Sequence, residues 1–128
     1  MIEILPMEDR ERERELLGDV ETIGGVPRVL LMADRGKPLG HVVVETAGTV
    51  LRILRLEAAG YDFAQKPQGE TVFILDSLMR AAASYGETLG AQSIETAFPD
   101  FFGFFHNRGF DTDEAHAFTP MGTIVKYG

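Results

Sequence analysis

The segment from Thr71 to Leu89 most constrains the fold, because its pattern predicts a helix that is apolar on two adjacent faces. Two sets of apolar or small residues follow helical spacing there: Val72, Leu75, Met79, Ala82, Gly86 and Leu89, then Ile74, Leu78, Ala81 and Tyr85. Gly90 follows directly and supplies the glycine that commonly ends a helix. We therefore expect this segment to be the main buried helix.

Short runs with strand character lie on both sides of this helix. Branched and aliphatic residues in alternating or continuous apolar runs predict strands at Ile2–Leu5, Arg28–Met32, Gly40–Glu45, Thr49–Glu57 and Ser93–Ala97. The second and third form a hairpin. The fourth is apolar on much of both faces, so we expect it at the centre of the sheet.

The remaining segments complete a mixed sheet flanked by helices. Glu8 to Leu17 predicts a mostly exposed helix, whose charge run is interpreted as a solvated face. Further along, the pattern predicts a loop at Gly60–Gly69, a short helix at Pro99–Arg108 and closing strands near Glu114–Phe118 and Thr123–Tyr127. The expected class is α/β, in a single domain over residues 1–128.

Composition excludes several classes of function. The 128 residues carry a formal net charge of −8, which argues against nucleic acid as a partner because phosphate binding needs a surplus of Lys and Arg. There is no cysteine and there are only three histidines, so a structural metal is not expected. No uncharged apolar run approaches the ~20 residues that span a bilayer. We expect a soluble cytoplasmic protein with no membrane partner.

Two short motifs add a resemblance to a known family. Phe104-Phe105-His106-Asn107-Arg108-Gly109-Phe110 is similar to the late helix of the GNAT superfamily, which ends in an aromatic pair, three variable residues and Gly-Phe. Tyr85-Gly86-Glu87-Thr88-Leu89-Gly90-Ala91 resembles the end of that family's cofactor-side helix. With the order of elements, the resemblance covers nearly the whole chain. It implies transfer of an acyl group from acetyl-CoA to a small-molecule or peptide amine.

The resemblance also implies where the acyl donor binds. A bulge in the strand Arg52–Ala58 would expose N–H groups to the pantetheine amides, which places the donor along Leu56, Glu57 and Ala58. The diphosphate would lie at the start of the long helix, on Lys66, Gln68, Gly69, Glu70, Thr71 and Val72. The family pattern there is matched outright only at its central glycine, Gly69. The alternative interpretation is an ordinary loop that leads into a helix.

The same resemblance points to Glu57 as the general base that deprotonates the acceptor amine, the alternative being a surface glutamate at a strand end. The tyrosine that protonates the leaving thiolate in the family falls on Phe105, which has no hydroxyl and would only pack against apolar neighbours or the thioester region of the cofactor. His41 is interpreted as an outward-facing strand residue.

Two functions therefore remain open. One is an acetyl-CoA-dependent N-acetyltransferase acting on an unidentified amine. The other is a catalytically degenerate protein of the same fold that serves as a ligand-binding or interaction module. Few residues lie between the first helix and Arg28 to form an acceptor pocket. A homodimer in which a partner subunit completes this pocket is therefore kept open.

Overall fold

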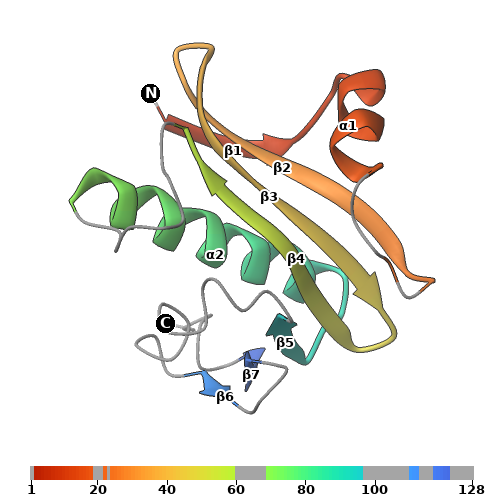
Figure 1. The fold of residues 1–128 in the computed structure, drawn as a ribbon. Coiled ribbons are helices and arrows are strands. Elements are labelled where there is room, and N and C mark those ends of the chain that lie inside the picture. The colour runs from red at the N-terminus through yellow and green to blue at the C-terminus, as the bar shows by residue number, and fades with distance from the viewer. Residues whose placement is uncertain are drawn as a thin grey trace.

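The fold is a mixed α/β arrangement (Figure 1). The computed structural model describes residues 2–18, 22, 24–59, 69–96, 110–112 and 117–121. In these residues the elements are β1 (Ile2–Pro6), α1 (Arg10–Leu17), β2 (Val26–Asp34), β3 (Lys37–Ala47), β4 (Val50–Ala58), α2 (Glu70–Thr88), β5 (Ser93–Thr96), β6 (Asp111–Thr112) and β7 (Ala117–Pro120). The α/β class predicted from the pattern is confirmed.

One sheet contains the seven strands of the described residues, in the order β1-β2-β3-β4-β5-β7-β6. Neighbouring strands are antiparallel except β4 and β5, which are parallel. Parallel neighbours need a long crossover, and the chain between β4 and β5 contains α2. The predicted central strand, β4, is the fourth of the seven.

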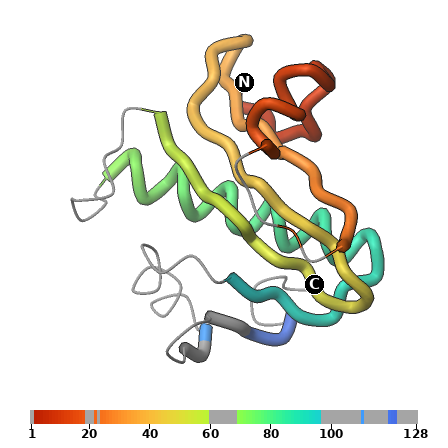
Figure 2. The backbone as a smooth tube through the Cα atoms, turned by 45° about the vertical axis from the view of Figure 1, so that its right-hand side comes forward, coloured from red at the N-terminus to blue at the C-terminus, as the bar shows by residue number. Residues whose placement is uncertain are grey.

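The two helices cover opposite faces of this sheet (Figure 2). Successive residues of a strand point to opposite faces. Val42 and Val44 of β3 belong to the main core cluster with α2, whereas Val43 packs in a smaller cluster with Leu16 and Leu17 of α1. The main core therefore lies between α2 and the sheet, and we call the other side the α1 face.

The long helix agrees closely with its prediction. α2 begins one residue before Thr71 and ends at Thr88. After it, the Gly90 N–H donates to the Glu87 carbonyl and the Ala91 N–H donates to the Gly86 carbonyl, both at 2.9 Å, which closes the helix as the glycine predicts. In the described part of the chain, no helix is long and apolar enough to cross a membrane.

The first helix begins later than predicted. It starts at Arg10 because the Asp9 carboxylate accepts a hydrogen bond from the Arg12 N–H at 3.1 Å and so acts as the N-cap. Its charge run is not wholly solvated either, since Glu13 is buried against the sheet. The interpretation of this helix as a solvated face is wrong at that residue.

The C-terminal part is described in pieces. The strand expected near Glu114–Phe118 overlaps β7 at its last two residues, and β6 was not predicted, because a two-residue strand is too short to show alternation. Phe110 is buried in the main core. The expected helix at 99–108, the strand at 123–127 and most of the loop at 60–69 lie outside the described residues.

Candidate functional site

A bulge interrupts the centre of the sheet. Val43 on β3 pairs with Arg55 on β4, but the next residue, Val44, pairs with Ile53, so Leu54 has no partner in the ladder. Among the described residues, β5 pairs with β4 only from Val50 to Ile53. The bulge that the resemblance implies for Arg52–Ala58 is therefore present, at the point where the described pairing to β5 stops.

The N-cap of α2 is Gly69, whose φ of 56° and ψ of −122° lie outside the helical region. As the N-cap it has no side chain to bond the first turn. The first N–H groups of a helix have no acceptor within their own helix and carry the positive end of its dipole. Of the predicted diphosphate residues, Gly69, Glu70, Thr71 and Val72 form this turn, whereas Lys66 and Gln68 lie outside the described residues.

Glu57 lies on the far side of the bulge, near the end of β4. Its side chain is 35% exposed and lines a hollow of about 180 Å³ on the α1 face, together with Arg12, Leu31 and His41. The carboxylate has one oxygen, Oε1, 3.7 Å from Nη1 of Arg55. Glu57 is thus a partly exposed carboxylate in a hollow, where a bound molecule could come within hydrogen-bond reach of it.

His41 is a candidate site residue whose position beside Glu57 the sequence pattern does not predict. It was interpreted as outward-facing, but its side chain is only 15% exposed and its Nε2 lies 3.3 Å from Oε2 of Glu57. This contact lacks hydrogen-bond geometry, so in the described structure the buried Nε2 has no hydrogen-bond partner. The signal that could have found it is the cross-strand register, which pairs His41 with Glu57.

The environment favours the neutral form of this histidine. Burial lowers the pKa of His41 most, and the positive charges of Arg55 and Arg12 lower it further, while the negative charge of Glu57 acts in the opposite direction. The imidazole is therefore uncharged near neutral pH and does not form an ion pair with Glu57.

The other predicted donor residues differ in what they can contribute. The side chain of Leu56 is fully buried in the main core, so only its backbone is available to a ligand, whereas Ala58 lines the same hollow as Glu57. Phe105 lies outside the described residues. No group of three or more His, Asp or Glu in the described ranges is arranged to hold a metal ion.

Two buried carboxylates on the α1 face hold the scaffold beside this hollow. Glu13 of α1 accepts hydrogen bonds from Arg28 at 2.9 Å and from the Val29 N–H at 3.0 Å. Further along the sheet, Glu45 lies 3.3 Å from Arg52 and accepts from the Gly25 N–H at 2.8 Å. These contacts fix α1 and the loop before β2 on the sheet.

Comparison with known proteins gives a result at the level of the fold. No protein-family model matches the sequence, and no curated protein matches it. Among solved structures, an IAA acetyltransferase from Bacillus cereus has a TM-score of 0.68 and 13% identity, covering 94% of this chain and 99% of its own. An aminoglycoside 6'-N-acetyltransferase from Enterococcus faecium has a TM-score of 0.67 and 10% identity, covering 93% and 97%.

A third structure carries the family in its description. It is an acetyltransferase of the GNAT family from Staphylococcus aureus Mu50, with a TM-score of 0.63 and 9% identity, and the match covers 94% of this chain and 99% of its own. The chain has the GNAT fold. At identities of 9% to 13% the similarity shows the fold alone, so the acceptor substrate and the acyl donor have to be argued from the residues. The resemblance first seen in two short motifs is confirmed at that level.

Proposed function

We propose that this protein is an acetyl-CoA-dependent N-acetyltransferase in which Glu57 is the general base for an amine acceptor. The observation that carries the proposal is the close packing at Gly40. A Cβ on Gly40 would clash with the carbonyl oxygen of Glu57 and would lie 3.1 Å from Cγ2 of Ile74 in α2. Ile74 lies just over one turn into α2. The helix N-terminus and the Glu57 end of β4 are therefore close together.

The donor fits the residues on the α2 side of this junction. The glycine N-cap leaves the first-turn N–H groups without a side-chain acceptor, which suits a diphosphate. Gly69, Glu70, Thr71 and Val72 would hold that group, with Lys66 and Gln68 preceding them in the chain. The β4 backbone beyond the bulge, at Leu56 to Ala58, would hold the pantetheine arm. Acetyl-CoA supplies the acyl group as a thioester.

Glu57 acts on the acceptor from the α1 face. Its carboxylate takes a proton from the ammonium group of the acceptor, and the freed nitrogen forms a bond to the thioester carbonyl carbon. The carbon–sulfur bond breaks, its electron pair leaves on sulfur, and the thiolate takes the second proton that the nitrogen loses as the amide forms. Neutral His41 supports this role because it does not form an ion pair with Glu57. Phe105 has no hydroxyl, so the thiolate leaves without an acid at that position.

A second candidate is a ligand-binding module that has lost catalysis. Two features favour it: the phenylalanine at position 105, and the carboxylate of Glu70 in the first turn of α2, where it adds negative charge near a bound phosphate. Such a protein would bind coenzyme A or its thioesters without turnover. The two candidates differ in a single measurable property, which is amine-dependent release of the thiol.

The test combines calorimetry with an assay of thiol release. We expect micromolar binding of acetyl-CoA and amine-dependent release of free thiol. Glu57→Gln should lower kcat by about 10²-fold or more, as loss of a general base does, with an unchanged Kd for acetyl-CoA. Glu11→Gln, an exposed glutamate of α1, is the matched control. Binding without thiol release would leave the ligand-binding module, and full kcat in Glu57→Gln would exclude Glu57 as the base.

A further inference from the structure

A lateral row of side chains connects Glu57 to the edge of the sheet. Glu57 on β4 pairs with His41 on β3, His41 pairs with Leu31 on β2, and Leu31 pairs with Leu5 on β1. Leu31 packs in the cluster on the α1 face, so this row lies on that face. Adjacent strands are about 4.8 Å apart, which puts β1 about 14 Å from β4. An extended small molecule is therefore long enough to span the row from Glu57 to Leu5.

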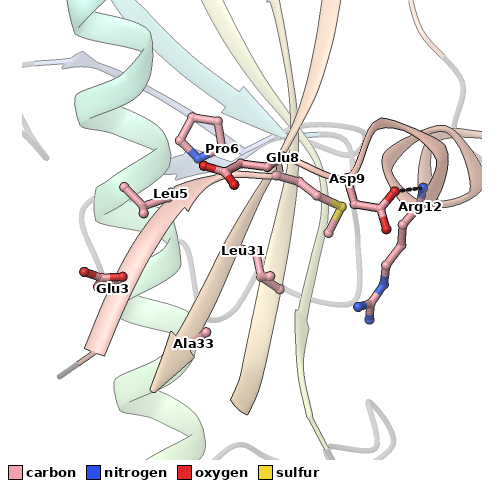
Figure 3. Close-up of a pocket in the computed structure, with 9 residues that line it drawn as sticks. Glu3, Leu5, Pro6, Glu8, Asp9, Arg12, Leu31 and Ala33 are labelled. Atoms are coloured by element: carbon pink, nitrogen blue, oxygen red, sulfur yellow. Dashed lines mark hydrogen bonds between the residues drawn. The ribbon is translucent and has the colours of Figure 1, made fainter. Parts of the chain in front are cut away.

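The surface above this row is hollowed along its length. Beside the Glu57 hollow is a larger one of about 430 Å³, and both are lined by Arg12 and Leu31. Figure 3 shows this second hollow, with Leu5, Leu31 and Ala33 on the strands and Arg12 at the start of α1. Leu5 is 56% exposed, so its side chain is accessible to a molecule in this hollow. The two hollows adjoin at Arg12 and Leu31, and we treat them as one groove, whose lining is mostly apolar in the larger hollow and mostly polar around Glu57.

Charges are placed unevenly along this groove. Glu57 lies at one end, and Glu3 and Glu8 line the other. Asp9 also lines the larger hollow, where its carboxylate accepts a hydrogen bond from the Arg12 N–H. Arg12 lies between the two ends, where the two hollows meet. Its guanidinium repels a cation in the middle of the groove, while the carboxylates attract cations at both ends. The pattern is complementary to a molecule that is positive at each end and uncharged between.

We propose that the acceptor is a linear diamine whose reacting nitrogen lies at Glu57, whose hydrocarbon chain crosses Leu31, and whose second ammonium group lies beside Glu3 and Glu8. This inference rests on the proposed acetyl transfer at Glu57. The reacting ammonium gives one proton to Glu57, and its nitrogen bonds to the acetyl carbon. The carbon–sulfur bond breaks, its electron pair leaves on the sulfur of coenzyme A, and this thiolate takes the second proton that the nitrogen loses, so that an amide and the free thiol result. The second ammonium group takes no part in the reaction.

The test compares amines that differ in one feature each. Diaminooctane has both ends and an uncharged middle, octylamine lacks the second cation, spermidine adds a cation to the middle, and glucosamine has no apolar chain. We expect the highest kcat/KM for diaminooctane, with octylamine, spermidine and glucosamine each lower. Equal or higher kcat/KM for glucosamine would overturn the groove assignment, even if acetyl transfer itself is observed.

Variants locate the second ammonium group. The double variant Glu3→Gln/Glu8→Gln should reduce the ratio of kcat/KM for diaminooctane to that for octylamine by about fivefold, the scale of exposed charge pairs. Leu5→Lys, at an exposed position, should reduce the same ratio by placing a cation at that end. Glu11→Gln/Glu15→Gln, with two exposed α1 glutamates outside the groove, is the matched control for net charge. An unchanged ratio in the groove variants would overturn the proposal.

Binding measurements separate the failure of this inference from failure of the proposed function. Calorimetric titration with diaminooctane in the absence of acetyl-CoA should give heat that the double variant weakens. If diaminooctane binds in this way but no amine is acetylated, the groove is retained and the transferase proposal fails. If short polar amines are acetylated and diaminooctane does not bind at millimolar concentration, the transferase proposal is retained and the groove fails.

Discussion

Nε2 of His41 lies 3.3 Å from Oε2 of Glu57 across the ladder between β3 and β4. An imidazole this close to a carboxylate is often protonated, yet burial and the charges of Arg55 and Arg12 lower the pKa of His41. The imidazole of this pair is therefore neutral at pH 7, and its lowered pKa gives the fold a sensitivity to acid.

The lowered pKa of His41 predicts a dependence of stability on pH. In the unfolded chain His41 has its ordinary pKa of 6.5, so the unfolded state binds the proton more readily than the folded state does. Stability is therefore greatest above pH 6.5 and is lost as the pH falls through the lower pKa of the folded state. His41→Gln should give a flatter profile of Tm against pH in this window. Parallel profiles for the two proteins would contradict the assignment.

Glu13 predicts a second loss of stability at lower pH. Burial acts to raise the pKa of Glu13, but hydrogen bonds from the Val29 N–H, Arg28 and Arg10 outweigh it and lower the pKa below 4.5. The unfolded state then binds the proton more readily, so this contribution is complete above pH 4.5 and disappears as the pH falls through the folded-state pKa. A thermal titration between neutral pH and pH 3 measures this loss.

Glu13→Gln tests the same site at neutral pH. The side chain is 5% exposed, and its neutralisation leaves the partly buried Arg28 guanidinium, 19% exposed, without its charged partner. Breaking a buried ion pair in this way destabilises a protein by about 3 kcal/mol. Glu15→Gln, an exposed position in the same helix, should change the free energy of unfolding by less than about 0.5 kcal/mol. Urea denaturation of both variants provides the comparison, and equal midpoints would refute the role of Glu13.

Gly69→Val is expected to weaken binding of acetyl-CoA by about tenfold or more, because a branched side chain is strained at a φ of 56° and displaces the first-turn N–H groups. Gly36→Val is the matched control. Gly36 also has a positive φ, of 83°, with open space around it, but it lies in the turn between β2 and β3. Calorimetry should find weak binding only in the first variant. Equal affinity in both would place the diphosphate elsewhere.

Gly86→Ala tests the packing of α2 on the sheet. A Cβ on Gly86 would lie 2.9 Å from Cβ of Leu51, in the main core. Overpacking of this kind costs about 1–3 kcal/mol. Gly18→Ala, at the end of α1, meets only ordinary contacts at 3.5 Å and has a helical φ of −62°, so it should be neutral or slightly stabilising. Chemical denaturation of the two variants should separate them by more than 1 kcal/mol.

Part of the candidate site could be predicted from local pattern. The start of α2 at the Gly69 turn and the position of Glu57 near the end of a central strand both follow from periodicities within one segment. Lys66, Gln68 and Phe105 stay predictions, since they lie outside the described residues. The groove to Glu3 was not predicted, because its residues come from four strands and one helix.

What the sequence by itself determined is the order of the elements and the buried face of α2, because helical and strand periodicities are properties of neighbouring residues. Only the tertiary structure decided that His41 meets Glu57 and that Glu13 is buried. The first depends on strand register, because a bulge such as the one at Leu54 shifts by one residue which side chains face each other. The second depends on how α1 packs on the sheet, where Glu13 meets Arg28 and the Val29 N–H. Contacts between segments that are far apart in the sequence decide these arrangements, so the pattern within one segment does not predict them.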